Sequence, residues 1–389
     1  MIPVAEALDR ICALLSTMPV EHVPLRECAG RILAQPVSAR RTQPPFAASA
    51  MDGYAIGESD AQVGHSLRVV GESQAGLGFN GEVSAGCAVR IFTGAPVPSG
   101  AQRVVIQEDV TRSLDSITLN SIDQGLHIRP AGADFSKGDI VSAGLITPAR
   151  IALLAAMNIA EVPVYRRPVV ALIATGDELV VPGEQPGPDQ IVSSNIYAVT
   201  AIVQAAGATP RILPIAPDTL DGLRDVLDMA RGADLIVTLG GASVGDHDLV
   251  AQVAGDAGLA LDFYKVAMRP GKPLMAGRLG DAIMIGLPGN PVSAFVCAHV
   301  FLRPALDRML GGTGAPLPRS VMPLTKALGP NAGREHYMRA VREGDGVRVY
   351  DRQDSSLLSV LDASDILVVR APNDPARIAG DMVETIPLH

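Results

Sequence analysis

The sequence predicts a multidomain α/β protein built around a doubly wound, mostly parallel sheet. Three apolar runs of strand length, at residues 169–174, 235–239 and 282–287, each end in a loop of glycine, proline or acidic residues. Helix-type segments alternate with strand-type runs in this part of the chain, a pattern typical of parallel sheets with helical crossovers. Loops that leave the carboxyl ends of parallel strands gather at one edge of the sheet, where such folds bind ligands. We therefore expect the functional site at that edge.

The helical segments of this domain carry local signals at both ends. Asn195 and Thr219 suit the N-caps of two helices, because their side chains can accept hydrogen bonds from free backbone N–H groups. Gly207 and Gly232 suit the positions that end these helices, since glycine readily adopts the left-handed conformation found there. A short apolar run at 212–215 lies between them and predicts a further strand.

At 389 residues the chain is too long for one ordinary core, which predicts several domains. Its first residues and those after Thr147 show apolar side chains at helical spacing. Short β-type runs separated by glycine-rich turns lie between these stretches and predict a small all-β domain inserted into a helical one. We predict an elongated, discontinuous N-terminal domain (1–46 and 141–167), the inserted β domain (47–140), the α/β domain (168–312) and a C-terminal β-barrel-like domain (318–389).

Composition and charge argue against several functional classes. The formal net charge of −9 disfavours nonspecific binding to nucleic acid or to acidic membranes. The cysteines form no CxxC pair, which argues against a zinc knuckle or a disulfide framework. The chain has no apolar run of membrane-spanning length, and its first residues lack the pattern of a secretory signal. We expect a cytoplasmic protein that binds neither nucleic acid nor a membrane.

The loop at 240–248 is the first candidate binding site. Its glycines allow the backbone to approach a ligand closely, and the start of the following helix favours negative charge. Asp246 and Asp248 supply the oxygen ligands that Mg²⁺ prefers. They can instead cap the helix, an effect of about 0.3–1 kcal/mol, but capping does not account for the whole loop.

Two further segments are candidates for contacts with an anion. Lys265, Arg269 and Lys272 lie close together in a chain that is otherwise acidic. Cations neutralise phosphate oxygens while carboxylates hold a metal, so a basic turn beside acidic loops suits a metal-bound phosphate. The rigid Pro-Gly-Asn-Pro turn at 288–291 leaves Asn290 free to face an anion. Each segment is also compatible with a purely structural turn.

Six ordered segments carry a resemblance to a known family. They are SAMDGYA (49–55), FTGAPVPSGA (92–101), ATGDEL (174–179), GGASVGDHD (240–248), MRPGKP (268–273) and LPGNPVSA (287–294). They resemble the MoeA family, the molybdopterin molybdenumtransferases, which includes the C-terminal domain of gephyrin. The similarity extends over nearly the whole chain.

The resemblance implies a homodimer and a reaction. In the family, adenylylated molybdopterin and molybdate give molybdenum cofactor and AMP with the assistance of Mg²⁺. Dithiolene sulfurs of the pterin, rather than protein side chains, ligate the molybdenum. The cleft lies between the α/β domain and the β domain of the other subunit, so Asp52 is expected to act across the dimer. A molybdopterin adenylyltransferase and molybdoenzyme maturation factors are expected partners.

The resemblance also assigns roles to single residues. It implies catalytic roles for Asp52, Thr93, Asp134, Glu178 and Asp248, and metal binding by Glu178, Asp246 and Asp248. The loops and the basic turn, read together with the resemblance, predict binding of the pterin nucleotide by Thr175, Gly176, Asp177, Gly240, Gly241, Ser243, Gly245, Lys265, Arg269, Lys272, Pro288, Gly289, Asn290, Pro291 and Ser293.

Departures from the family pattern leave two alternatives. Ala47 and Ala48 replace a polar Asp-Asn pair close to Asp52, which is compatible with a noncatalytic paralogue that binds molybdopterin. Arg269 replaces a usual lysine, which keeps the charge but alters the geometry. The other alternative is a molybdopterin adenylyltransferase that uses the α/β domain and ATP, although the additional domains argue against it.

Overall fold

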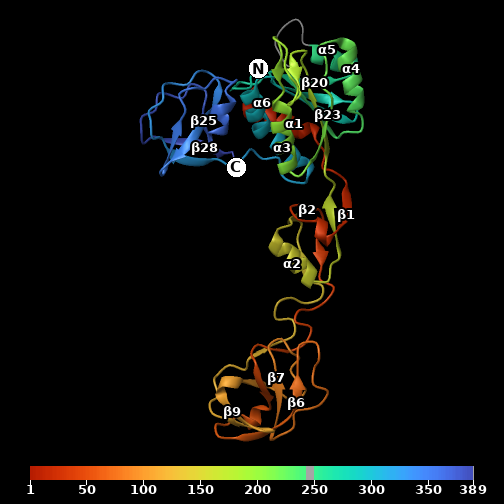
Figure 1. Ribbon diagram of the computed structural model, residues 1–389, viewed down its shortest axis with the longest axis vertical. Helices are drawn as coiled ribbons and strands as arrows, with labels where there is room; N and C mark the ends of the chain where they lie inside the picture. Colours follow the sequence, from red (N-terminus) through yellow and green to blue (C-terminus); the bar gives the residue numbers. More distant parts are fainter. Residues whose placement is uncertain (242–248, 389) are drawn as a thin grey trace. The chain divides into compact units, whose positions relative to one another are not determined.

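The computed structural model describes residues 1–241 and 249–388, which form two compact units (Figure 1). One unit combines Met1–Glu21 with Tyr165–His389, and the other is His22–Val164. Both helices and sheets occur, which confirms the predicted mixed α/β class. In the described part of the chain no helix has the length and apolar character needed to cross a bilayer.

A six-stranded sheet forms the centre of the first unit. Its first four strands are parallel, and the last two run antiparallel at one edge. The three apolar runs form strands with the expected bounds, because every residue of 235–239 and 282–287 is buried. In spatial order the strands are β18 (Thr209–Ile212), β15 (Val169–Ala174), β19 (Leu235–Leu239), β23 (Ala282–Leu287), β22 (Met275–Leu279) and β20 (Ala260–Tyr264).

Helices cover both faces of this sheet (Figure 1). On one face they share an apolar cluster with the buried side chains Leu172, Val237 and Ile285. On the other face a second cluster contains Ile173, Ile236 and further aliphatic side chains. The first layer consists of α1 (Val4–Leu14), α3 (Asn195–Ala205), α6 (Pro291–Cys297), a π-helical turn (Ala298–Leu302) and α7 (Arg303–Met309); the second consists of α4 (Leu220–Met229) and α5 (Leu249–Asp256).

Of the two predicted N-caps, Thr219 caps its helix and Asn195 does not. The Thr219 hydroxyl accepts a hydrogen bond from the Gly222 N–H (3.2 Å), which confirms Thr219 as the N-cap of α4. Asn195 is not an N-cap: α3 begins at this residue, and Ser194 occupies the cap position without a side-chain cap bond. The predicted strand at 212–215 also lies slightly earlier, at Thr209–Ile212.

A second sheet in the same unit includes a strand from the basic turn. The short strand β21 runs parallel to β25, so the segment at Met268–Arg269 is hydrogen-bonded into the C-terminal sheet. The strands are β21 (Met268–Arg269), β24 (Ser320–Pro323), β25 (Glu335–Glu343), β26 (Gly346–Val349), β27 (Ile366–Arg370) and β28 (Met382–Pro387), with helix α8 (Leu358–Asp362); the remaining pair in this unit is β16 (Leu179–Val180) with β17 (Ile191–Val192).

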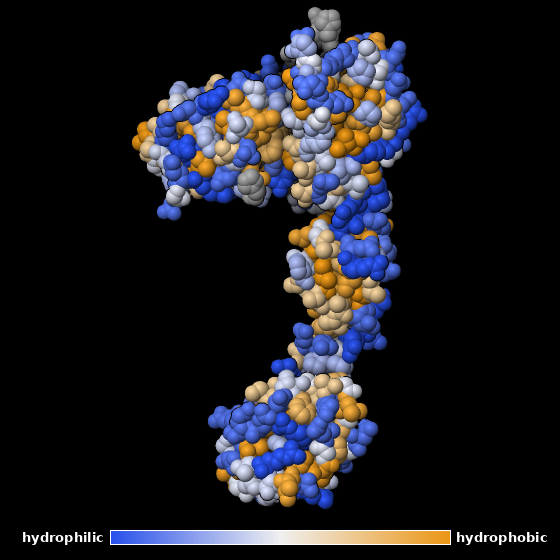
Figure 2. Space-filling model, in the orientation of Figure 1, coloured by the Kyte–Doolittle hydropathy of each residue, from blue (hydrophilic) through white to orange (hydrophobic). Residues whose placement is uncertain are grey.

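The second unit contains a six-stranded sheet and smaller strand groups. The sheet follows the order β8, β5, β7, β6, β10, β9. Figure 2 shows apolar residues gathered over α2, where several alanines are exposed. The elements are β1 (Val20–Pro24), β2 (Ile32–Leu33), β3 (Val37–Ser38), β4 (Ala48–Ser49), β5 (Gly53–Ile56), β6 (Ser66–Ser73), β7 (Cys87–Ile91), β8 (Arg103–Ile106), β9 (Val110–Ser113), β10 (Ser116–Leu119), β11 (Ile128–Arg129), β12 (Ile140–Val141), β13 (Gly144–Leu145), α2 (Pro148–Ala156) and β14 (Glu161–Tyr165).

Candidate functional site

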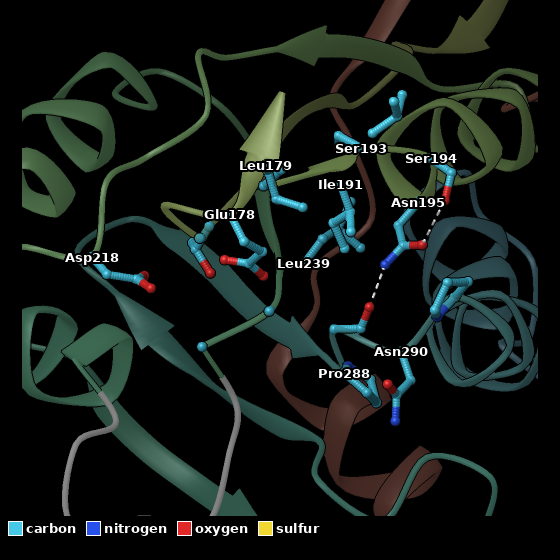
Figure 3. Close-up of a pocket in the computed structure, with 18 of the residues that line it drawn as sticks. Glu178, Leu179, Ile191, Ser193, Ser194, Asn195, Asp218, Leu239, Pro288 and Asn290 are labelled. Carbon is cyan, nitrogen blue, oxygen red and sulfur yellow. Dashed lines mark hydrogen bonds between the residues drawn. The ribbon is translucent and has the colours of Figure 1, made fainter. Parts of the chain in front are cut away.

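A pocket of about 910 Å³ opens in the first unit at the carboxyl ends of β15, β19 and β23 (Figure 3). This is the edge at which the parallel sheet was expected to bind a ligand. The loops that follow the three strands form its rim, and α3, α5 and the C-terminal region complete it. The lining residues are Ala174, Thr175, Gly176, Glu178, Leu179, Ile191, Val192, Ser193, Ser194, Asn195, Asp218, Leu239, Gly240, Gly241, Leu249, Val250, Pro273, Pro288, Gly289, Asn290, Pro291, Ser356 and Leu358.

The predicted binding residues divide into those that line this pocket and those that do not. Those on the rim are Thr175, Gly176, Glu178, Gly240, Gly241, Pro288, Gly289, Asn290 and Pro291. Those away from it are Asp177, Lys265, Arg269, Lys272 and Ser293, the last buried within α6. Ser243, Gly245, Asp246 and Asp248 lie outside the described residues.

The two glycines after β19 allow the rim to be compact. Gly240 and Gly241 both have positive φ angles, of 104° and 65°, which favour glycine. A Cβ atom at Gly240 would lie 2.8 Å from the Thr175 hydroxyl oxygen, and one at Gly241 would collide with the Val250 side chain. The backbone therefore lies directly against β15 and α5, where a larger residue has no room.

The Thr175 hydroxyl group is buried at the pocket wall and has no hydrogen-bond partner among the described residues. The residue is 5% exposed. It lines the pocket beside Gly240. Buried polar atoms are nearly always paired in native proteins, so this hydroxyl suits a partner that enters the pocket.

The Pro-Gly-Asn-Pro turn is held by a side chain from another element. Asn195 donates a hydrogen bond from Nδ2 to the carbonyl oxygen of Gly289 (2.6 Å), and the Ser194 hydroxyl donates to Asn195 Oδ1 (3.3 Å) (Figure 3). Asn290 makes no side-chain cap bond to α6 and is exposed. Asn195 thus holds the turn through the Gly289 carbonyl, while the Asn290 side chain is exposed.

Acidic residues gather at one side of the pocket. Figure 3 shows Glu178 and Asp218 on the same side, and Asp177 Oδ1 accepts a hydrogen bond from the Asp218 backbone N–H (3.0 Å). Partial burial, followed by the charges of Asp177 and Glu178, raises the pKa of Asp218 above its usual range. Asp218 was not predicted, because next to the capping residue Thr219 it looks like an ordinary helix-start carboxylate.

The described residues alone do not form a magnesium site. Carboxylate oxygens such as those of Glu178 and Asp218 suit a hard cation. Across residues 1–241 and 249–388, however, no group of three potential metal ligands comes together. The predicted ligands Asp246 and Asp248 lie outside these ranges.

The turn that carries Lys265, Arg269 and Lys272 is held by packing and hydrogen bonds, and none of these three residues lines the pocket. Lys265 has a φ angle of 78°, unusual for a residue with a side chain, and its ammonium lies over the Tyr264 ring at 5.2 Å. Its backbone carbonyl accepts a hydrogen bond from the Ile2 N–H (3.2 Å). Gly271 leaves no space for a Cβ atom above the buried Cys297 sulfur. Only Pro273 of this turn reaches the pocket lining within the described residues.

The C-terminal region supplies pocket residues that the sequence did not indicate. Ser356 and Leu358 line the pocket, and the Ser355 carbonyl accepts a hydrogen bond from the Val292 N–H (3.0 Å). The buried Arg339 donates to the Leu357 carbonyl (3.3 Å), which holds this segment in place. No local motif marks these residues, because their position follows from the packing of α8 and the segment before it against α6.

Asp52 and Thr93, predicted as catalytic, meet in the second unit. Asp52 Oδ1 accepts hydrogen bonds from the Thr93 N–H (2.7 Å) and from the Thr93 hydroxyl (2.8 Å). These two bonds, assisted by the positive charge of Arg90, lower the pKa of Asp52. Asp134 is exposed in the same unit, and its backbone N–H donates to the Gln43 carbonyl (3.0 Å).

The chain is similar to known protein families and to individual proteins. A model described as the MoeA N-terminal region (domain I and II) matches residues 2–158, and one described as a probable molybdopterin binding domain matches 171–308. The molybdopterin molybdenumtransferase of Haemophilus influenzae is 38% identical over 296 residues, covering 75% of this chain and 73% of its own. The chain belongs to the MoeA family.

Other MoeA proteins agree over the greater part of the chain. Molybdopterin molybdenumtransferase 2 of Mycobacterium tuberculosis is 37% identical over 333 residues, covering 82% of both chains. Two crystal structures of the molybdopterin biosynthesis MoeA protein from Pyrococcus horikoshii give TM-scores of 0.87 and 0.82 at 27% and 28% identity. They cover 100% and 99% of this chain and 99% and 100% of their own.

In this MoeA family member Ala47 and Ala48 take part in backbone pairing close to Asp52 in the sequence. Ala48 is 5% exposed and lies in β4, where it pairs with Arg129 of β11. The Ala47 carbonyl accepts a hydrogen bond from the Val97 N–H (2.8 Å). Small apolar side chains suit a strand packed in this way. The two alanines therefore fit the fold at this point of the chain.

Proposed function

We propose that the protein is a molybdopterin molybdenumtransferase that converts adenylylated molybdopterin and molybdate to molybdenum cofactor and AMP. The observation that carries the proposal is the pocket at the carboxyl edge of the parallel sheet. It lies within the segment matched by the molybdopterin binding domain, together with flanking residues from the C-terminal region. Its rim offers glycine backbone, hydroxyl and amide groups, which suit a phosphorylated pterin nucleotide.

Each described rim residue contributes a definite property to substrate binding. Gly240 and Gly241 let the backbone approach the phosphoanhydride closely, and the Thr175 hydroxyl, which has no partner among the described residues, would supply a hydrogen bond. Asn290 presents a neutral amide at the mouth of the pocket. Asp218, whose pKa is raised by burial and by the charges of Asp177 and Glu178, lies at the acidic side of the pocket. The pterin sulfurs, being soft donors, hold the molybdenum of the product.

Mg²⁺ belongs to the proposal as a charge-neutralising ion for the phosphoanhydride. Glu178 is the described residue that would contribute a ligand, together with Asp246 and Asp248. Lys265, Arg269 and Lys272, which lie on the turn whose Pro273 lines the pocket, would balance the remaining phosphate charge. Removal of divalent ions with a chelator is expected to stop turnover, and readdition of Mg²⁺ should restore it.

We further propose a cytoplasmic homodimer of four-domain subunits, in which Asp52, Thr93 and Asp134 act on the nucleotide bound by the partner chain. The apolar surface over α2 is of the kind that subunit contacts bury. Asp52 and Thr93 form a preorganised pair in the second unit, far in sequence from the sheet that forms the pocket. A molybdopterin adenylyltransferase is proposed as the supplier of substrate and molybdoenzyme maturation factors as recipients of product.

A single assay tests the proposed reaction. The purified protein is supplied with adenylylated molybdopterin, molybdate and Mg²⁺, and AMP release is followed together with molybdenum incorporation. Release that depends on molybdate supports the proposal. Binding of the nucleotide without turnover would identify a noncatalytic paralogue, and pyrophosphate formation from ATP and free pterin would identify an adenylyltransferase.

A further inference from the structure

We infer that Arg90 is a positioning residue for Asp52. It holds the backbone of the Asp52 turn (residues 51–53) through one hydrogen bond to the Gly53 carbonyl and one to the Gln107 side chain. The inference rests on the proposed function only for the catalytic importance of Asp52. The contacts themselves all lie within the second unit, on strands β5 and β7 and the short helical turn after β8.

The guanidinium group of Arg90 connects two segments of backbone. Arg90 lies opposite Tyr54 in the antiparallel pairing of β7 with β5. Its Nη1 atom donates to the carbonyl oxygen of Gly53 (3.2 Å), and its Nη2 atom donates to Oε1 of Gln107 (2.7 Å). Gln107 in turn donates its backbone N–H to the Asp52 carbonyl (3.0 Å). Arg90 therefore holds the carbonyl groups on both sides of the Gly53 residue, one directly and one through Gln107.

Two aromatic rings fix the plane of the guanidinium. Its central carbon lies 5.0 Å from the centroid of the Tyr54 ring and 4.9 Å from that of Phe92. Contacts between arginine and aromatic faces of this kind restrict the side chain and are specific to a planar cation. Tyr54 is itself almost fully buried, at 3% exposure. The buried Tyr54 ring and the Phe92 ring thus restrict the guanidinium group that donates to the two acceptors.

Two residues on or just after strand β7 contact the Asp52 turn, one at its backbone and one at its carboxylate. Arg90 lies within the strand and contacts the backbone of the Asp52 turn. Thr93, two residues beyond the strand, holds the Asp52 carboxylate through its N–H and hydroxyl groups. The backbone near Asp52 and the Asp52 carboxylate are therefore both positioned by residues of β7 and its following turn. A loss of Arg90 should loosen the backbone half of this arrangement and misdirect the carboxylate.

An activity-independent measurement tests the structural part of the inference. Selective ¹⁵N-threonine labelling of the full-length protein reports the Thr93 amide that donates to Asp52. Arg90→Gln is expected to shift this resonance upfield and speed its hydrogen exchange by about tenfold. Arg90→Lys should behave similarly, because lysine keeps the charge but lacks the rigid fork of donors.

The outcomes of that measurement separate position from charge. Arg68→Gln is the control, since Arg68 is an exposed arginine on the neighbouring strand β6. It should leave the Thr93 resonance unchanged. A Thr93 resonance that stays in place in both Arg90 variants would overturn the inference. Full restoration by Arg90→Lys would also overturn it, because charge alone would then be sufficient.

Kinetics test whether Arg90 acts through Asp52. Both Arg90 variants are expected to lower kcat by about 10- to 100-fold while KM changes little, because a misplaced group costs turnover more than binding. In an Asp52→Ala background the same substitutions should cause no further loss. Independent, multiplicative losses would contradict the inference. If Asp52→Ala alone leaves turnover intact, the proposed role of Asp52 fails, while the Thr93 resonance still decides the positioning contact.

Discussion

Asn195 at the start of α3 donates its side-chain amide to the carbonyl oxygen of Gly289, 2.6 Å away in the turn after β23. This bond joins the first residue of α3 to a turn at the carboxyl edge of the sheet, 94 residues away in sequence. The turn carries Asn290 and two prolines of the pocket rim. The position of this turn therefore depends on the Asn195 side chain, which the local sequence pattern predicts to be a helix cap.

Replacing Asn195 should weaken nucleotide binding more than folding. Asn195→Ala removes the bond to Gly289, so we expect Kd for adenylylated molybdopterin to rise about tenfold and the free energy of unfolding to fall by about 1 kcal/mol. Gln204→Ala, at an exposed position of the same helix, is the control. Isothermal titration with the nucleotide and chemical denaturation measure the two effects. Equal affinities for the two variants would show that the turn does not need this bond.

Two glycines near α5 should respond oppositely to alanine. Gly240 has a φ angle of 104° and no room for a Cβ atom beside Thr175, so Gly240→Ala should destabilise the protein by at least about 1–3 kcal/mol. Gly255 lies within α5, and a Cβ atom there would meet no described atom within 4 Å beyond its chain neighbours and the helix backbone. Gly255→Ala should therefore stabilise by up to about 1 kcal/mol. Urea denaturation compares them. A neutral Gly240→Ala would mean that the rim can move aside.

The raised pKa of Asp218 predicts a pH-dependent effect on stability. An acid whose folded-state pKa is raised binds its proton more tightly in the folded protein, so its contribution to stability worsens as pH rises from the ordinary aspartate range through the folded pKa. Asp218→Asn removes this repulsion from Asp177 and Glu178. The variant should gain in Tm at pH 7 relative to the parent and gain less at pH 4. A larger gain at pH 4 would reverse the assigned sign.

Subunit mixing tests whether the proposed cleft is shared. Asp52→Ala and Glu178→Ala chains should each be inactive alone. Coexpressed in equal amounts, they should recover about a quarter of parental turnover, because half of the dimers are mixed and each carries one intact cleft. Separate affinity tags isolate the mixed dimer for assay. Inactive mixed dimers would indicate that each cleft is built within one chain.

The parts of the fold that sequence reasoning located are those with strong local patterns. The strands at 169–174, 235–239 and 282–287 are continuous apolar runs, because parallel strands are covered on both faces. Strand β22 was missed, since Gly277 interrupts a short run that lies against the backbone of β20. A short interior strand of this kind, which pairs with β23 on one side and β20 on the other, is set by its neighbours rather than by its own sequence.

The residues of the candidate site that could be predicted are likewise those with a local sequence signal. Thr175, Gly240 and the 288–291 turn were predicted because loop chemistry after an apolar strand is visible locally. Asp218 and Ser356 were not, because they reach the pocket through tertiary packing that leaves no local signal. The predicted role of Asn195 was wrong, since asparagine at a helix start is usually a cap and here bonds to a distant loop instead.

The pairing of β21 with β25 has a consequence for truncated forms of the protein. A chain cut near residue 317 would retain every rim loop after β15, β19 and β23, yet Met268–Arg269 would lose the strand beside it. It would also lose Ser356 from the pocket wall and the carbonyl that receives the Val292 amide. Proteolytic removal of about the last 70 residues should therefore disable nucleotide binding even though the parallel sheet survives.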